Sequence, residues 1–298
     1  MRQTRRVPVF ETTKDSVRRL QPKPFTNEKE LQKFIETNLS ILLGIRFVAS
    51  EFSTGDVHGG RIDTLGLDES GSPVIIEYKS NQSDSVLNQG LYYLAWLRDH
   101  RGDFELAVQK ALGSAAKVAW IAPRLILIAS SYTKFDLYAV GQFGTNVQLM
   151  RYQRYDHGTF VLEALGEQLT TKPKTEPPVT VEAEQYGVEY HHAKTTDEPW
   201  NAFLELRERL LALDGAEEHA NQKSQITYRT TRSFAAILFQ KNALLCQFKG
   251  DEKISDPKNR AQDIRSRQWG YPWAVSVKTA DDIEYAMFLL KNSYEFEQ

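Results

Sequence analysis

The clearest pattern of hydrophobic and polar positions in this chain is a pair of apolar runs separated by a short polar turn. Residues 61–67 and 73–79 are rich in isoleucine, leucine and valine, and residues 68–72 between them are polar and include Gly71. Glycine accepts the positive φ that a tight turn requires. The pattern therefore predicts a β-hairpin made of two neighbouring strands.

Apolar residues at helical spacing predict a helix on either side of this hairpin in the sequence. Residues 27–39 carry four apolar residues on one side, and Thr26 or Asn27 is placed to cap the helix. Residues 84–97 repeat the pattern, and Ser83 or Asp84 is placed to cap that helix. The hairpin is therefore expected to lie between two helices in the order of the chain.

The rest of the chain continues this mixture of helices and strands. After residue 97 we expect a connector, then strands at 124–129, 146–152 and 159–162, with a helix at 135–143. In the last hundred residues we expect helices at 200–213 and 281–294 and strands at 225–232, 234–240 and 243–249. The alternation of elements predicts an α/β fold.

Two acidic side chains and a lysine fall on the predicted hairpin. Side chains alternate along a strand, so Glu77 and Lys79 are expected to point the same way, and folding at the turn brings Asp63 towards them. Carboxylate oxygens suit Mg²⁺ or Mn²⁺, which can bridge a substrate phosphate and activate water. A lysine beside them can orient water and stabilise negative charge.

This hairpin resembles the active-site hairpin of the PD-(D/E)xK phosphodiesterase superfamily, with Asp63 as the first acid and Glu77-Tyr78-Lys79 as the E-x-K; Ile62 stands where the superfamily has proline. The resemblance implies a restriction-endonuclease-like fold, a sandwich of helices around a central mixed β-sheet. It also implies an endonuclease that hydrolyses DNA with Mg²⁺ or Mn²⁺. The metal would be held by Asp63, Glu77 and the main-chain carbonyl of Tyr78.

A glutamate on the helix ahead of the hairpin often completes the metal shell in this superfamily. Glu36 is the candidate here, and Glu51 is its rival. The alternative for Glu36 is an ordinary helix glutamate that faces water.

Gln89 and Tyr93 are four residues apart and share one face of the predicted helix. They resemble the Gln-x-x-x-Tyr element of the RecB-like and NucS-like branches, which implies contact with nucleic acid. The alternative is a core tyrosine beside a surface amide. We also assign substrate contact to Arg61 and to His58, whose loop leads to the hairpin, although a lone loop histidine usually has no such role.

Charge and composition limit the partners. The 298 residues carry a formal charge of −2, which does not fit a protein that coats DNA, so a locally basic surface is required. An N-terminal arm is one candidate, with a solvated terminus as the alternative; its basic residues are Arg2, Arg5, Arg6, Lys14, Arg18, Arg19 and Lys23, against Glu11 and Asp15.

Cellular location is inferred from what the sequence lacks. A single cysteine, Cys246, excludes an internal disulfide and predicts a buried apolar role. We expect a cytoplasmic protein with no membrane-spanning or signal segment. DNA is the expected partner, RNA remains open, and a homodimer is possible.

The C-terminal segment resembles the domain of unknown function DUF5655, through 203–209, 234–237, Gln240-Lys241 and the stretch from Trp269-Gly270 to Tyr294. The domain organisation is therefore a nuclease-like domain over 1–165 with the basic arm, a linker over 166–197 containing His191 and His192, and a smaller α+β domain over 198–298. The last domain has many basic and aromatic residues, which either contact a nucleic acid or form a solvated face and a core.

Two other functions remain open from the sequence. One is a non-catalytic nucleic-acid-binding protein on the same fold, although the presence of all three hairpin residues argues against a decayed site. The other is a regulatory scaffold for protein partners, because fold alone does not fix function.

Overall fold

The computed structural model divides the chain into two compact units, residues 1–177 and 178–298. It describes residues 8–55, 58–79, 86–120, 123–140, 147–165, 186–220, 222–266 and 270–297, without the side chains of Val86 and Lys134. Several predicted features lie outside these ranges: Arg2, Arg5 and Arg6, the cap at Ser83 or Asp84, residues 141–143 of the predicted helix, residues 166–185 of the predicted linker, and Trp269.

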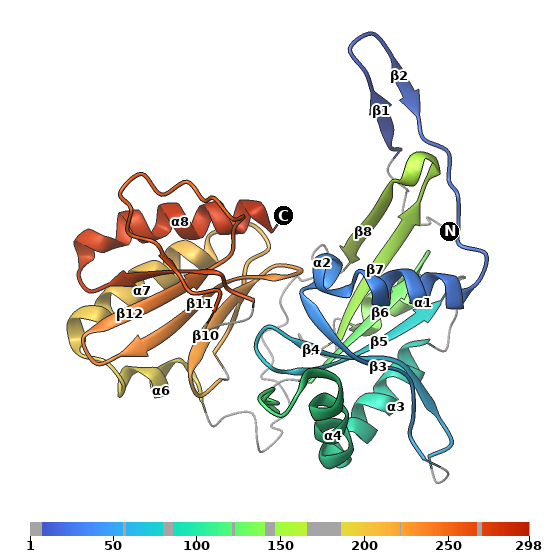
Figure 1. The fold of residues 1–298 in the computed structure, drawn as a ribbon, viewed down its shortest axis with the longest axis horizontal. Coiled ribbons are helices and arrows are strands. Elements are labelled where there is room, and N and C mark those ends of the chain that lie inside the picture. Colours follow the sequence, from blue (N-terminus) through green and yellow to red (C-terminus); the bar gives the residue numbers. More distant parts are fainter. Residues whose placement is uncertain are drawn as a thin grey trace. The chain divides into compact units, whose positions relative to one another are not determined.

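The first unit is built on a mixed six-stranded sheet, as the sequence predicted (Figure 1). In spatial order its strands are β3 (Ile45–Ser53), β4 (Arg61–Asp68), β5 (Pro73–Lys79), β6 (Arg124–Ala129), β7 (Val147–Arg154) and β8 (Phe160–Leu165). The β3–β4–β5 and β7–β8 pairs are antiparallel, and β5, β6 and β7 are parallel. The carboxyl ends of β5, β6 and β7 therefore meet at one edge of the sheet.

Helices cover both faces of this sheet. They are α1 (Glu28–Thr37), α2 (Leu39–Leu43), α3 (Val86–Asp99), α4 (Arg101–Leu112) and α5 (Lys134–Val140). Leu31 and Ile35 of α1 pack with Ile76 of β5 in one hydrophobic core. Residues of α3 and α4, including Leu97 and Phe104, pack with the opposite face in another. The predicted α/β sandwich with a central mixed sheet is confirmed.

Local signals placed α1 correctly, but the predicted connector after residue 97 is wrong. The side chain of Asn27 accepts the Glu30 N–H at 2.9 Å and caps α1. Most of the expected connector is α4, which buries Phe104 and Val108. Only two residues of its twelve are buried, so its apolar stripe is too thin to stand out in the sequence.

The N-terminal arm is an ordered hairpin over its described part, rather than a frayed terminus. Strands β1 (Phe10–Thr12) and β2 (Val17–Arg19) pair antiparallel and project from the first unit beyond the β7–β8 end (Figure 1). The 3-10 turn η2 (Asp156–Gly158) joins β7 to β8 and lies at the base of this hairpin, where Asp156 N–H donates to Gln21 O.

The second unit is an antiparallel six-stranded sheet with helices. In spatial order its strands are β13 (Gln262–Asp263), β14 (Trp273–Val277), β12 (Ala243–Phe248), β11 (Ser233–Gln240), β10 (Gln225–Arg229) and β9 (Glu217–His219). Helices α7 (Asp197–Leu211) and α8 (Ile283–Phe296) pack against each other and the sheet, and the turn η3 (Ala280–Asp282) precedes α8. Strands β9, β13 and β14 were not predicted.

The predicted linker extends too far towards the C-terminus. Residues 188–192 form α6 (Val188–His192), and the His191 side chain is fully buried against the ring of Phe239. Few large apolar residues precede Trp200, so the sequence pattern did not predict α6. Aromatic contacts hold this helix against the second unit. Cys246 is buried as predicted. No described helix has the length and apolar character to cross a membrane.

Candidate functional site

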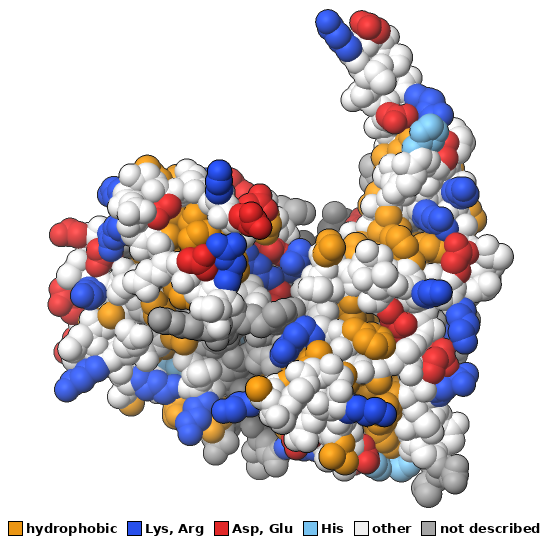
Figure 2. Space-filling model, viewed as in Figure 1, with side chains coloured by type: hydrophobic (Ala, Val, Ile, Leu, Met, Phe, Trp, Pro, Cys, Tyr) orange, Lys and Arg blue, Asp and Glu red, His pale blue; other side chains and the backbone are white. Residues whose placement is uncertain are grey.

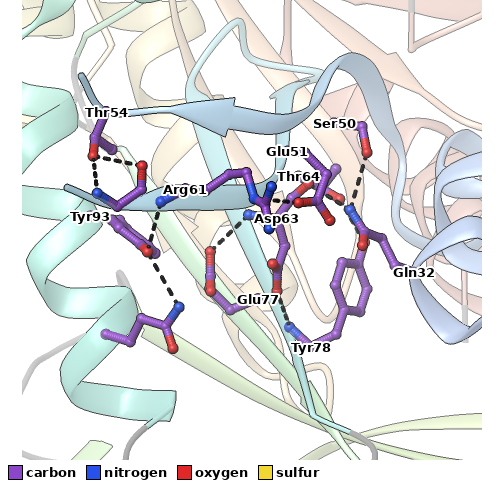
Figure 3. Close-up of polar contacts among 12 residues, drawn as sticks. Gln32, Ser50, Glu51, Thr54, Arg61, Asp63, Thr64, Glu77, Tyr78 and Tyr93 are labelled. Carbon is purple, nitrogen blue, oxygen red and sulfur yellow. Dashed lines mark hydrogen bonds and ion pairs between the residues drawn. The ribbon is translucent and has the colours of Figure 1, made fainter. Parts of the chain in front are cut away.

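The site begins where β4 and β5 separate. The last pair of their ladder is Thr64 with Ile76, one residue short of Asp63 and Glu77. Beyond this pair, carboxylate side chains accept backbone N–H groups in place of strand carbonyls. Asp63 N–H donates to Glu77 Oε1 at 3.1 Å, and Tyr78 N–H donates to Asp63 Oδ2 at 3.0 Å (Figure 3). Because each side chain bonds the other's strand, the acids are held together without direct strand pairing.

Glu51 lies opposite Asp63 on the neighbouring strand β3. Ser50 pairs with Thr64 and Phe52 with Ile62, which places Glu51 across from Asp63. Its φ of 52° is in the left-handed region, which is uncommon for a residue with a side chain. Backbone strain of this kind clusters at functional sites.

The alternation of side chains along β4 also breaks at Asp63. Ile62 joins the core on the α3 side, whereas Thr64, two residues further on, donates its hydroxyl to Glu36 of α1 at 2.6 Å. A regular strand would place both on the same face. Asp63 therefore sits at a local twist of the strand.

A cavity of about 890 Å³ opens beside Asp63. Its walls come from the end of β3, the β3–β4 loop, the start of β4 and helix α3. The lining residues are Glu51, Ser53, Gly55, Gly59, Gly60, Arg61, Asp63, Gln89 and Tyr93. Four of the sequence-predicted residues thus share this cavity with Glu51: Arg61, Asp63, Gln89 and Tyr93.

Tyr93 connects α3 to the start of β4. Its hydroxyl accepts the Arg61 N–H at 3.1 Å and the Gln89 side-chain amide at 3.3 Å (Figure 3). A Cβ at Gly60 would lie 2.6 Å from the Tyr93 ring, so glycine is required for this close approach. The Gln-x-x-x-Tyr pair therefore positions the backbone that leads into Asp63.

Arg61 lies at the rim of the cavity. Its guanidinium forms an ion pair with Glu51 at 2.5 Å and is 67% exposed. An exposed guanidinium at this place can contact a phosphate without burial of a new charge.

Burial and mutual repulsion raise the pKa of both acids. Burial raises the pKa of Asp63, partly opposed by the Tyr78 N–H bond and by Lys79, while Glu51 and Glu28 raise it further. For Glu77, burial and then the negative charge of Asp63 raise the pKa to about 9, against the lowering effect of the Asp63 N–H bond. A half-buried acid and a buried acid that repel each other form an environment that favours a cation.

Lys79 lies near the two acids but is paired with Glu28. Its Nζ is 3.3 Å from Glu28 Oε2 at the N-terminal end of α1, and its positive charge lowers the pKa of both Asp63 and Glu77. The predicted role of Lys79 in orienting water stays a prediction, and its ammonium contacts Glu28, an acid that sequence reasoning missed.

Glu36 does not reach the cavity. Its Oε1 accepts the Thr64 hydroxyl at 2.6 Å and the Gln32 side-chain amide at 3.0 Å, and Glu51 rather than Glu36 lines the cavity. Gln32 also donates to Asp63 O at 2.8 Å. Sequence reasoning missed Gln32 and Glu28, although a polar residue every four positions along this helix was a usable signal.

His58 is placed by aromatic contacts beside the cavity wall. Its backbone carbonyl accepts the Tyr92 hydroxyl at 3.0 Å, and its ring meets the His100 ring edge-on at 5.2 Å. The following Gly59 and Gly60 line the cavity, whereas His58 is not among its lining residues in the described part of the chain. Its predicted substrate contact stays a prediction.

The donor set fits a hard divalent cation that keeps water ligands. No cluster of three or more His, Cys, Asp or Glu side chains within the described ranges is arranged to hold a metal. Mg²⁺, however, is usually bound by one or two carboxylates together with water and substrate phosphate. The Asp63 and Glu77 pair meets that requirement, because it supplies two carboxyl groups close enough for a hydrogen bond between the side chains, whose mutual repulsion a cation would relieve.

Known proteins resemble the two units to different extents. Residues 188–297 match DUF5655, a domain of unknown function, so the chain carries this domain, as predicted. An uncharacterized protein of Haemophilus influenzae (strain ATCC 51907 / DSM 11121 / KW20 / Rd) is 27% identical over 300 residues, which cover 96% of this chain and 98% of that protein.

Solved structures give a weaker likeness. A complex of EndoMS with double-stranded DNA is 21% identical with a TM-score of 0.32, covering 44% of this chain and 47% of that one. A repair endonuclease from Pyrococcus abyssi is 20% identical with a TM-score of 0.29, covering 45% of this chain and 50% of that one. The chain thus spans about half the length of each of these two proteins.

Proposed function

We propose that the first unit is a divalent-metal-dependent endonuclease that hydrolyses a phosphodiester bond of DNA. The observation that carries this proposal is the Asp63 and Glu77 pair, a half-buried and a buried acid that accept backbone N–H groups of each other's strands at 3.1 Å and 3.0 Å. Asp63 also lines the open cavity, and Glu77 lies behind it. Holding two acids this close raises the pKa of both and costs stability, so a chemical role is the better explanation for the pair.

The resident cation would be Mg²⁺ or Mn²⁺, held by Asp63 and Glu77. The Tyr78 main-chain carbonyl and Glu51 are the further candidates, since Glu51 lines the same cavity and Glu36 does not. When bound, the cation would lower the pKa of water and neutralise charge on the phosphate.

The side chains of this chain supply the remaining functions. Lys79, placed by Glu28, orients the attacking water and offsets the charge that develops on the phosphate. Arg61 at the cavity rim binds a phosphate oxygen of the substrate. Tyr93 and Gln89 hold the Arg61 backbone and, through it, the start of β4.

The position of Gln89 and Tyr93 beside the acidic pair supports a place in the NucS-like and RecB-like branch of the PD-(D/E)xK superfamily. Both residues line the cavity that Asp63 also lines. On that basis we propose a role in DNA repair or defence.

A cleavage assay tests the proposal. Wild type, Lys79→Ala, Asp63→Asn and the control Asp15→Asn, an exposed site on the N-terminal hairpin, are incubated with single-stranded, duplex, flapped and mismatched DNA and with RNA. We expect cutting that requires Mg²⁺ or Mn²⁺ and stops in EDTA. Lys79→Ala and Asp63→Asn should cut at least a hundredfold more slowly than wild type. The control Asp15→Asn should cut at the wild-type rate. Cutting by Asp63→Asn at the wild-type rate would refute the site.

A further inference from the structure

The N-terminal hairpin has one face that no described residue covers. Phe10 pairs with Arg19 and Thr12 with Val17, so these four side chains share one side of the hairpin. We call this side the open face. All four residues are exposed, and the apolar side chains are strongly so, with Phe10 at 50% and Val17 at 70%.

The opposite side of the hairpin and its base are fixed to the first unit. Arg18, on the opposite side, forms ion pairs with Glu11 at 3.4 Å and with Asp156 at 3.6 Å. At the base, Gln21 N–H donates to Asp156 Oδ1 at 3.1 Å, and Leu20 is buried. The hairpin is therefore held in one direction and does not hang freely.

A two-stranded hairpin without a covering layer is marginally stable in water, and an uncovered strand pair invites association. Contact with a partner would remove the exposed side chains of Phe10 and Val17 from water, which is favourable in free energy. The anchoring at the base maintains the open face in the absence of that partner, which is the behaviour of a preformed binding element.

The hairpin projects from the same edge of the sheet as the candidate active site. Lys79 ends β5 and Arg154 ends β7, and these parallel strands end at one edge. Lys23 N–H donates to Arg154 O at 2.9 Å, which ties the base of the hairpin to that end of β7. Arg151 is in register with Ala129 and, through it, with Lys79, so Arg154 lies three residues beyond Lys79 and the hairpin extends further in that direction.

Charge favours a nucleic acid as the occupant. Arg19 lies on the open face and Lys14 lies at the turn, and neither makes an ion pair with any residue in the described ranges. Figure 2 shows basic and acidic side chains along the hairpin, and residues 8–23 contain four basic residues against two acidic ones, although the whole chain carries −2. A second copy of the chain is disfavoured, because a self-complementary contact of the open face would bring Arg19 towards its own symmetry mate.

We propose that the open face of the β1–β2 hairpin is a second nucleic-acid contact, in which Lys14 and Arg19 bind backbone phosphates and Phe10 packs on a base or sugar. This inference rests on the proposed function, since it takes the substrate of the active site as the occupant.

Binding measured without cleavage tests this proposal. A labelled 30-base-pair duplex is titrated by fluorescence anisotropy in Ca²⁺ at several KCl concentrations, with wild type, Lys14→Gln/Arg19→Gln and Phe10→Ala. The matched control is Lys110→Gln/Lys117→Gln, two exposed lysines of the same unit far along the chain from the hairpin. Circular dichroism and sedimentation of each variant verify the fold and the oligomeric state.

Each phosphate contact contributes about 0.9 to the slope of log K against log salt, so the hairpin double variant should lower that slope by roughly two. Phe10→Ala should weaken binding roughly tenfold without changing the slope, and the lysine control should match wild type. An unchanged slope in the double variant would overturn the proposal. So would a wild-type dimer that Phe10→Ala dissociates, since the occupant would then be a second copy.

The two proposals fail separately. If Lys79→Ala cuts like wild type while the hairpin variants lose binding as described, the active-site assignment falls and the hairpin contact stands. If Lys79→Ala stops cutting while the hairpin double variant keeps the wild-type salt slope, the active-site assignment stands and the hairpin contact falls.

Discussion

Replacing Glu77 by glutamine should stabilise the metal-free first unit at neutral pH. Burial and the charge of Asp63 raise the Glu77 pKa from 4.5 to about 9. The folded state therefore keeps a proton that the unfolded chain releases above pH 4.5, and stability falls as pH rises through this range. Glutamine still accepts the Asp63 N–H that Glu77 Oε1 accepts at 3.1 Å, and it has no proton to lose.

The size of the effect follows from the pKa. One pKa unit corresponds to about 1.4 kcal/mol, and pH 7 lies roughly 2.5 units above the ordinary glutamate value, so keeping the Glu77 proton costs the folded state roughly 3 kcal/mol relative to the unfolded chain at pH 7. Glu77→Gln should therefore match wild type near pH 4.5 and exceed it by up to about 3 kcal/mol at pH 7. Added Mn²⁺ should stabilise wild type and leave the variant unaffected.

Urea unfolding read by pulsed hydrogen exchange resolves this prediction. Peptides from β5 report the first unit, and peptides from β11 report the second, which should not respond. Asp15→Asn, on the exposed hairpin, is the control for loss of one acid. If Glu77→Gln were less stable than wild type at pH 7, or if wild type kept the same stability from pH 4.5 to pH 7, the buried-acid reasoning would be refuted.

Three further substitutions have definite expected outcomes. Gly60→Ala should slow cleavage at least tenfold, because its Cβ would lie 2.6 Å from the Tyr93 ring; kinetics on the best substrate measure this. Glu28→Gln should lower kcat up to about tenfold with KM unchanged, because the Lys79 ammonium loses the carboxylate 3.3 Å away that places it. Glu297→Ala should destabilise the second unit by about 3 kcal/mol, because its fully buried carboxylate is 2.8 Å from an arginine; urea unfolding measures this.

Each of these predictions has a matched control or a contradicting result. Gly102→Ala places a Cβ in open space on α4 and should leave cleavage unchanged. Normal cleavage by Gly60→Ala would mean that the Tyr93 wall is irrelevant to the reaction. Wild-type kcat in Glu28→Gln would remove the positioning role, and an unchanged midpoint for Glu297→Ala would show that its ion pair contributes nothing.

The sequence predicted the fold of the first unit well because local signals agreed there with packing. The runs at 61–67 and 73–79 became β4 and β5, and Asn27 caps α1 as expected. Helix α4 and the short strands β9 and β13 were missed, because few of their side chains are buried and their patterns are weak. The extent of the linker was wrong, because the contacts of His191 come from residues distant in the sequence.

The candidate site was predictable in its centre and unpredictable at its margins. Spacing along two strands was enough to bring Asp63 and Glu77 together, since alternation and a hairpin turn fix that geometry. The choice between Glu36 and Glu51 depended on a left-handed residue at 51 and a break in alternation at 63. The pattern of hydrophobic and polar positions predicts neither of these backbone features. The pairing of Lys79 with Glu28 joins residues 51 positions apart and required the fold.

Binding of Mn²⁺ to the acidic pair is the most direct test of the account. Electron paramagnetic resonance counts bound Mn²⁺ in wild type, Asp63→Asn and the control Asp15→Asn at neutral pH, without any nucleic acid. The account predicts one Mn²⁺ per chain in wild type and the control, and none in Asp63→Asn. Equal binding by wild type and Asp63→Asn, or no binding by either, would contradict the claim that Asp63 and Glu77 hold a catalytic cation.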